Sequence, residues 1–208
     1  NKEEEIIEQM TTLPGVKYLK DNADFALGIV TGNNKRYVLD KVCPGAEPVL
    51  KGNDVFKYNF YPGGNYLIFE QNKFQQVAPE HLYRAPEKLI YRCINENLIF
   101  AYDDGQTLSL NSANIIIPRL KGYAIKYILA VLNSRPVQYF HTLSFSSVKV
   151  LRKHLESIPI PPCPQIRQGQ IVDLVDRIIK AEDSSIRLKL YDQIDQHILD
   201  LYQLTEEQ

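Results

Sequence analysis

Residues Gly28 to Leu39 read Gly28-Ile29-Val30-Thr31-Gly32-Asn33-Asn34-Lys35-Arg36-Tyr37-Val38-Leu39. The apolar ends of this run predict two strands, and its polar centre predicts the loop that joins them. Gly and Asn tolerate positive φ, so the Gly-Asn-Asn centre is typical of a tight turn. The loop should display a hydroxyl, two amides and two cations, from Thr31, Asn33, Asn34, Lys35 and Arg36. Asn pairs with adenine edges, and Lys or Arg with guanine or phosphate, so the set suits duplex DNA. Taken alone, the stretch is explained at least as well by a polar turn without a ligand.

A second polar turn repeats this chemistry. Residues 47–55 form a short extended piece that runs into a Gly-Asn pair, a typical turn signal. The polar groups that it brings together are Lys51, Asn53, Asp54, Lys57 and Tyr58. Two such loops in one basic region argue for a binding role more strongly than one.

The charge of the chain is uneven along its length. The 208 residues have a formal net charge of −1, but the first ten carry −3 and residues 156–208 carry −5, which leaves about +7 for residues 11–155. No acidic residue occurs from Gly105 to Leu155, where the basic ones are Arg119, Lys121, Lys126, Arg135, Lys149, Arg152 and Lys153. A polyanion is therefore the expected partner of the middle of the chain. The alternative is that some of these cations pair with the acidic C-terminal helices.

The pattern of elements predicts an α+β fold. Short strands separated by turn residues indicate a β-rich lobe of antiparallel or mixed strands, expected at residues 25–30, 36–42, 66–70, 88–94, 98–102, 107–110 and 113–117. Helical periodicity follows, and a C-terminal pair of amphipathic helices comes after the proline-rich run 158–164. The predicted domains are an N-terminal remnant of an upstream segment at 1–24, a β-rich domain with helices near its end at 25–157, a linker at 158–164, and the helical pair at 165–208.

No catalytic or metal-binding motif is apparent in the sequence. The four histidines are scattered, and no nucleophile elbow, phosphate-binding loop or acidic metal-nuclease pattern is present. The cysteines, Cys43, Cys93 and Cys163, are odd in number and far apart, which indicates reduced thiols. No apolar run reaches the length of a membrane span, so a cytoplasmic location without membrane contact is expected. A chain that begins at Asn1 rather than Met is expected to be a fragment.

An ordered series of motifs closely resembles the TaqI-like C-terminal specificity domain. In chain order the motifs are Gly28–Lys35, Glu47–Asp54, Pro86–Arg92, Leu108–Ser112, Leu129–Ser134 and Ile158–Pro161. The terminal run Leu199–Glu207 also resembles the last helix of such proteins and of type I specificity subunits. Each motif is a turn with a strand, so the series is more specific than any member. The resemblance implies target recognition in type IIG restriction–modification enzymes and related adenine-specific DNA methyltransferases.

The resemblance also implies residues and partners. The residues it favours most for contacts with double-stranded DNA are Thr31, Asn33, Asn34, Lys35 and Arg36. A second set would be Lys51, Asn53, Lys57 and Arg92, while Lys149, Arg152 and Lys153 would anchor phosphates. Catalysis would belong to another module of the same parent chain, which would use S-adenosylmethionine and, if it also cleaves DNA, Mg²⁺. This fragment itself would hold no catalytic residue, metal or cofactor. Two alternatives stay open: a protein-interaction module that uses the helical pair without DNA contact, and a hydrolase with an unfamiliar site.

Overall fold

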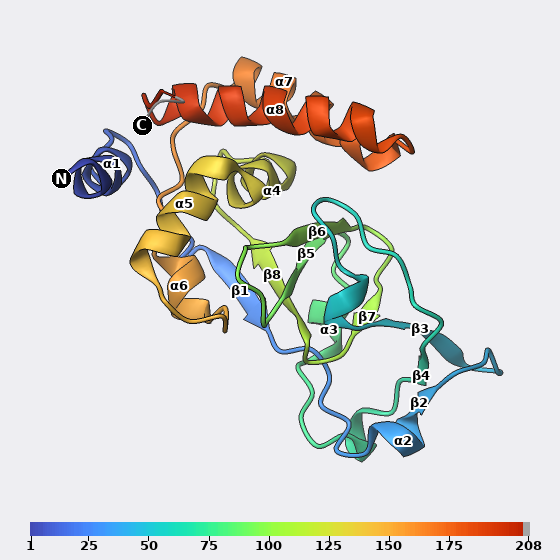
Figure 1. Ribbon diagram of the computed structural model, residues 1–208. Coiled ribbons are helices and arrows are strands. Elements are labelled where there is room, and N and C mark those ends of the chain that lie inside the picture. The colour runs from blue at the N-terminus through green and yellow to red at the C-terminus, as the bar shows by residue number, and fades with distance from the viewer. Residues whose placement is uncertain (206–208) are drawn as a thin grey trace. The chain divides into compact units, whose positions relative to one another are not determined.

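The computed structural model describes residues 1–205 and has the predicted α+β fold (Figure 1). The last residues of the terminal motif Leu199–Glu207 lie outside this description. The chain forms two compact units. We call Asp24–Asn95 with Ile99–Ile117 the β unit, and Asn1–Ala23, Glu96–Leu98 and the residues from Pro118 onward the helical unit.

The β unit contains two four-stranded sheets. One has the order β1-β8-β5-β6 and the other β2-β4-β3-β7. Strands β3 and β7 are parallel, whereas the pairs β2-β4, β3-β4, β5-β6 and β5-β8 are antiparallel. The strands are β1 (Ala23–Ala26), β2 (Val38–Leu39), β3 (Ala46–Leu50), β4 (Tyr66–Ile68), β5 (Lys88–Arg92), β6 (Phe100–Asp103), β7 (Leu108–Ser109) and β8 (Ala113–Pro118). The mixed sheet that the sequence predicted is thus confirmed.

The core of the β unit is built from apolar residues of these strands and of the segments beside them. Ile29, Val49, Leu67, Leu108 and Ile115 are fully buried in one cluster. The tyrosine of α3 (Glu80–Tyr83) joins that cluster, and its hydroxyl donates to the carbonyl of Leu27 at 2.7 Å. Burial raises the pKa of Tyr83. This core holds the strands from which the polar turns extend.

The predicted loop of the opening stretch is partly helical. Residues Asn34–Tyr37 form a single helical turn, α2, instead of an irregular connection. Asn33 caps it, because its side-chain oxygen accepts a hydrogen bond from the Arg36 amide at 3.2 Å. The two strands that flank this stretch, β1 and β2, belong to different sheets, so the stretch carries the chain from one sheet to the other.

Gly28 is required where the chain leaves β1. A β-carbon there would lie 2.1 Å from the carbonyl oxygen of Leu110 and 2.9 Å from that of Ala113. Both neighbours are backbone atoms, so neither can rotate away. We therefore expect Gly28→Ala to lower the free energy of unfolding by about 1–3 kcal/mol or more, measured by urea denaturation.

Gly169→Ala is the matched control for that substitution. Gly169 lies inside a helix with no atom within 4 Å of an added β-carbon. Alanine at this position should stabilise the protein by about 0.5–1 kcal/mol. Equal denaturation midpoints for Gly28→Ala and the unsubstituted protein would contradict the close approach at Leu110.

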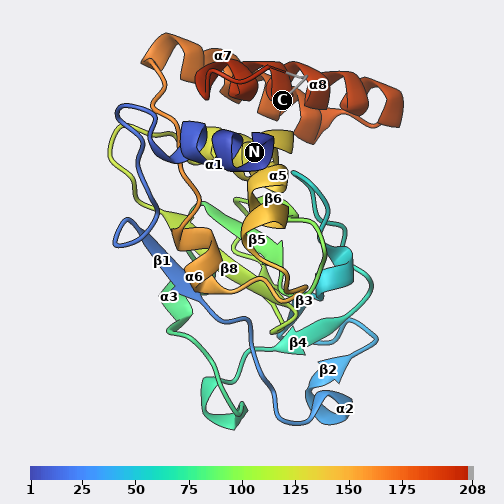
Figure 2. The same ribbon diagram turned by 60° about the vertical axis from the view of Figure 1, so that its left-hand side comes forward.

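The helical unit consists of α1 and α4 to α8 (Figure 2). Their bounds are α1 (Lys2–Thr11), α4 (Ile125–Asn133), α5 (Arg135–Ser144), α6 (Arg152–Glu156), α7 (Gln165–Lys180) and α8 (Ser184–Leu201). The predicted amphipathic pair α7 and α8 lie side by side, and the expected cap is present, because the Asp183 carboxylate accepts from the Ser185 amide at 2.8 Å. Within residues 1–205, no helix is both long and apolar enough to cross a membrane.

The boundary between the units differs from the predicted domain 25–157. Helices α4, α5 and α6 cluster with the C-terminal helices instead of with the strands. Their apolar faces explain this, because α4 is almost wholly buried and packs on α7, while α5 packs on α8. The proline-rich run joins the same core: Tyr127 and Tyr202 donate to the carbonyls of Pro161 and Pro159.

Two buried histidines make the helical unit sensitive to acid. His141 on α5 is 1% exposed, and neither of its ring nitrogens has a hydrogen-bond partner among residues 1–205. His154 on α6 stacks on Phe145 with 3.9 Å between ring centroids. Burial lowers the pKa of both histidines. Electrostatic repulsion lowers each pKa further, from His154 in the case of His141 and from Lys153 in the case of His154. Burial lowers the pKa of His197 as well.

Protonation of these histidines should therefore favour the unfolded chain. Below a pH of about 6.5 the unfolded chain binds protons that the folded protein does not, so the free energy of unfolding decreases as the pH is lowered. Above that pH neither state binds these protons, and the histidines have no effect on the pH dependence of stability. We expect the free energy of unfolding to decrease by up to about 1.4 kcal/mol per pH unit for each histidine, measured by urea denaturation. His141→Gln should reduce this slope; an unchanged slope would contradict the assignment.

Candidate nucleic-acid interface

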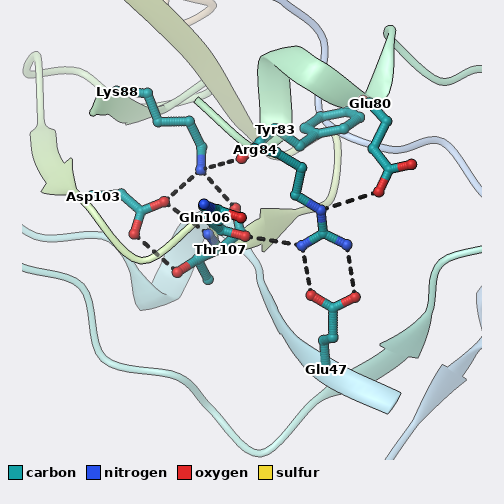
Figure 3. Close-up of polar contacts among 8 residues, drawn as sticks. All are labelled: Glu47, Glu80, Tyr83, Arg84, Lys88, Asp103, Gln106 and Thr107. Carbon is teal, nitrogen blue, oxygen red and sulfur yellow. Dashed lines mark hydrogen bonds and ion pairs between the residues drawn. The ribbon is translucent and has the colours of Figure 1, made fainter. Parts of the chain in front are cut away.

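A buried ion pair joins β5, the strand that carries the candidate residue Arg92, to β6 (Figure 3). Lys88 at the start of β5 and Asp103 at the end of β6 are 0% and 1% exposed, and the ammonium donates to the carboxylate. The ammonium also donates to the carbonyls of Tyr83 at 2.8 Å and Thr107 at 2.9 Å. Burial lowers the pKa of Lys88, while Asp103 opposes the change. All three protons of the ammonium thus have acceptors, as a buried cation requires.

Asp103 organises the turn that follows β6. Its carboxylate accepts from the Gly105 amide at 3.0 Å, and from the Thr107 amide and hydroxyl, each at 2.9 Å. The same side chain therefore satisfies the turn and neutralises Lys88. Loss of either member of the pair would leave a buried charge without its counterion.

A second ion pair in the same view fastens α3 to β3. Arg84 donates to both carboxylate oxygens of Glu47, at 2.6 and 2.8 Å, to Glu80 at 3.2 Å and to the carbonyl of Gln106 at 3.1 Å (Figure 3). The hydrogen bonds to Glu47 raise the pKa of Arg84 above its already high value. Glu47 opens the second polar motif of the sequence, so this bidentate contact positions the strand that leads to Lys51.

The first predicted group surrounds α2. Asn33, Asn34, Lys35 and Arg36 are exposed there, and the Arg36 guanidinium lies 5.4 Å from the Tyr37 ring centroid. Thr31 differs from them, because it is 3% exposed and its hydroxyl donates to Asn34 and accepts from the Asn33 amide. Thr31 thus supports the turn through its side chain, and its contact with DNA stays a prediction. Lys35 projects from this turn with no ion pair within residues 1–205.

The second predicted group gathers around the one-turn helix η1 (Gly52–Asp54) and the start of the hairpin that follows it. Arg92 on β5 donates through Nε to the carbonyl of Val55 at 2.7 Å, and its guanidinium lies 5.2 Å from the Phe56 ring centroid. Lys51 and Asn53 are exposed on the neighbouring helix η1, whose Asp54 side chain accepts from the Lys51 amide. Lys57 is half-buried. The structure therefore brings Lys51, Asn53 and Arg92 to one region.

Two aromatic residues in this region were not predicted from the sequence. Phe56 and Tyr61 are 45% and 47% exposed, with ring centroids 5.6 Å apart. The hairpin between them is anchored at Tyr58, a buried residue with φ of 73° whose amide donates to the Phe100 carbonyl at 2.7 Å. The sequence feature that could have identified them is the run of aromatic residues after the Gly-Asn turn. Their exposure, however, depends on the anchoring of the hairpin to β6, which is distant in the chain.

The two groups lie at opposite ends of the strands that join them. Strand β4 lies between β2 and β3: Val38 of β2 pairs with Leu67 of β4, and Leu67 pairs with Glu47 of β3. Because α2 directly precedes β2, it lies level with the start of β3, whereas η1 directly follows the end of β3. At about 3.3 Å per residue, the five steps from Ala46 to Lys51 separate the levels by roughly 17 Å. The predicted residues of the β unit thus form two separate polar groups.

The third predicted group belongs to the helical unit. Lys149, Arg152 and Lys153 are exposed around the start of α6, and Arg152 is 3.6 Å from Glu156. A cation of the basic middle region is neutralised by a C-terminal helix, because Lys126 is 2.5 Å from Asp176 of α7. The pairing that the sequence left open as an alternative therefore occurs at Lys126.

The side chains of these groups are suited to binding a ligand rather than to holding a metal ion. Within residues 1–205, the structure has no cluster of histidine, cysteine or acidic side chains that could hold a metal ion. Cys43, Cys93 and Cys163 are free thiols, as predicted. Amides, cations and exposed aromatic rings on rigid turns are the means by which proteins contact base edges and phosphates.

Comparison with known proteins gives a family and one related sequence. The family described as TaqI-like C-terminal specificity domain matches residues 47–160. The Type II methyltransferase M.VspI of Vibrio sp. (strain 343) is 43% identical over 51 residues, which are 24% of this chain and 12% of that protein.

Solved structures share the fold at low sequence identity. The HsdS subunit from Thermoanaerobacter tengcongensis aligns with 97% of this chain and 50% of its own, with a TM-score of 0.52 and 14% identity. The Type IIL restriction-modification enzyme MmeI, solved in complex with DNA, aligns with 94% of this chain and 33% of its own, with a TM-score of 0.58 and 11% identity. This chain thus spans half or less of these proteins.

Proposed function

Because the chain belongs to the TaqI-like C-terminal specificity domain family, and so serves DNA sequence recognition in restriction–modification systems, we propose that its β unit contacts the bases of double-stranded DNA. The observation that carries this proposal is the pair of exposed polar groups on rigid turns. The α2 turn is fixed by the side-chain hydrogen bonds of Thr31 and Asn33, and the second turn by the hydrogen bond from Arg92 to the Val55 carbonyl and by the contact of Asp54 with the Lys51 amide. Preorganised contacts lose less entropy on binding and discriminate better between sequences.

The two groups would meet the duplex at separate places. Their separation of roughly 17 Å exceeds the major-groove width of about 12 Å, so one groove cannot hold both at the same level. At α2, the amides of Asn33 and Asn34 suit adenine and the Lys35 ammonium suits guanine. At the hairpin tip, the exposed rings of Phe56 and Tyr61 offer apolar contact with thymine methyl groups, beside the cation of Arg92.

The catalytic partner is proposed to be a module of the same parent protein. The Type II methyltransferase relative and the Type IIL restriction-modification enzyme support a parent of the methyltransferase or restriction-modification class. Adenine as the methylated base, S-adenosylmethionine as the methyl donor and Mg²⁺ for any cleavage are part of the proposal. In such a parent this chain would supply specificity and the other module the chemistry.

The helical unit has an apolar pocket of about 340 Å³ on its surface, lined by residues of α1, α5 and α8 that include Ile6, Pro136 and Leu199.

A fluorescence titration tests DNA binding directly. The chain is titrated into labelled duplex and into the matching single strand, at about 50 and about 200 mM salt. We expect duplex to bind more tightly than single strand, with affinity falling steeply as salt increases. No duplex affinity, or an affinity insensitive to salt, would contradict the proposal and favour the protein-interaction module.

A further inference from the structure

The helical unit has a groove of about 610 Å³ whose charged residues are mostly lysines. One wall is the segment Val16–Asn22, which carries Lys17 and Lys20, and the other is α6 with Lys153. The segment was expected to be only a remnant of an upstream linker. In the folded chain it lies beside Lys153, one of the predicted phosphate contacts.

The wall that carries Lys17 and Lys20 is rigid. The backbone of Lys17 pairs with that of Ile160 in both directions, at 3.0 and 2.8 Å, and Leu19 between the two lysines is fully buried. The Asn22 side chain donates to the Tyr18 carbonyl at 3.0 Å, and the backbone carbonyl of Asn22 accepts from the Arg119 amide at 2.8 Å. The two lysine side chains, by contrast, are exposed.

The second wall is anchored in the same way. His154 and Leu155 are 4% and 0% exposed, so the short helix α6 is fixed on its inner side while Lys153 faces solvent. The Ser157 hydroxyl donates to the His154 carbonyl at 2.8 Å and closes the end of the helix. The groove thus has two fixed walls.

The charge of the groove is positive. Lys17, Lys20 and Lys153 form no ion pair within the described part of the chain, 1–205. Of the two carboxylates at the groove, Glu156 already faces Arg152 at 3.6 Å, which leaves Asp21 as the acidic counterpart of three lysines. Exposed lysines are often only solvated, but three unpaired ammonium groups around one groove repel each other, and an anion would relieve that repulsion.

We propose that this groove binds the phosphodiester backbone of duplex DNA, with Lys17, Lys20 and Lys153 as contacts to phosphate oxygens. This inference rests on the proposed function and extends its interface to the helical unit. Lysine is a compact point charge that suits phosphate, and phosphate contacts position a duplex without reading its sequence. The groove should therefore strengthen binding to all sequences equally.

The test uses the 208-residue chain with duplexes of random sequence across a salt series. Each lysine–phosphate contact contributes about 0.9 to the slope of log affinity against log salt. We expect Lys17→Ala/Lys20→Ala to make this slope shallower by about 1.8, so that between about 50 and about 200 mM salt its affinity falls roughly tenfold less than that of the unsubstituted chain. Adding Lys153→Ala should remove about 0.9 more. Lys2→Ala/Lys189→Ala, on exposed lysines of α1 and α8, is the matched control and should leave the slope unchanged.

Circular dichroism should show the same fold for every variant, because the replaced side chains are exposed. An unchanged slope and affinity in Lys17→Ala/Lys20→Ala would overturn the groove assignment while leaving the proposed function intact. A changed order of preference among individual duplexes would also overturn it, because it would mean base contacts. If the unsubstituted chain binds no duplex, the proposed function itself fails.

Discussion

Replacement of Lys88 by methionine is expected to lower the free energy of unfolding by about 3–5 kcal/mol. The substitution keeps an apolar stem of similar length but leaves Asp103 buried at 1% exposure without its counterion. It also leaves the carbonyls of Tyr83 and Thr107 without their donor. Urea denaturation followed by circular dichroism measures the effect, through the midpoint and its slope.

The control for this prediction is Lys73→Met. Lys73 is also paired, with Glu70 at 2.5 Å, but its side chain is 51% exposed. Exposed pairs contribute only about 0–1 kcal/mol, so the control should unfold near the unsubstituted protein. A loss below about 1 kcal/mol in Lys88→Met would mean that the pair does not hold the β unit together.

Substitution of Lys35 by alanine is expected to relax recognition at one base position. Lys35 is exposed on α2, forms no ion pair within residues 1–205, and lies on a turn fixed by the Asn33 cap. A base contact by such a side chain carries about 1–3 kcal/mol of discrimination, which is roughly fivefold to 150-fold in relative affinity. Competition between the preferred duplex and its single-base variants should show that loss at one position.

Lys41→Ala provides the matched control for Lys35→Ala. Lys41 is likewise exposed and belongs to the β unit, but it lies beyond β2 and outside both polar groups. It should leave the discrimination between single-base variants unchanged. If Lys35→Ala weakens all duplexes equally, Lys35 contacts phosphate instead of a base, and the assignment of α2 to base recognition is wrong.

The helices and most strands could be predicted from the sequence because their signals are local. The apolar stripes of α7 and α8 repeat with helical periodicity, and Asp183 stands where a capping residue should. Sheet pairing is not local. The parallel contact of Val49 with Leu108 joins positions that are distant in the chain, and no turn signal indicates it. For the same reason, the sequence did not indicate that β1 and β2, which flank one loop, lie in different sheets.

The candidate site was predicted in part for the same reason. Residue types identified Asn33, Asn34 and Lys35 as polar groups on a turn, and these are exposed. Burial could not be inferred, so Thr31 was grouped with them although its hydroxyl is bonded inside the turn. The exposure of Phe56 depends on a hairpin anchored to β6, and Lys17 reaches the groove through its pairing with Ile160.

The central claim is that the β unit reads base sequence, and selection from a random duplex library tests it most directly. The chain is incubated with the library at moderate salt, and bound duplexes are recovered and sequenced over several rounds. The claim predicts enrichment of one short motif, with preferences that Lys35→Ala alters and Lys17→Ala/Lys20→Ala leaves in place. Recovery of duplexes with no common motif would contradict it.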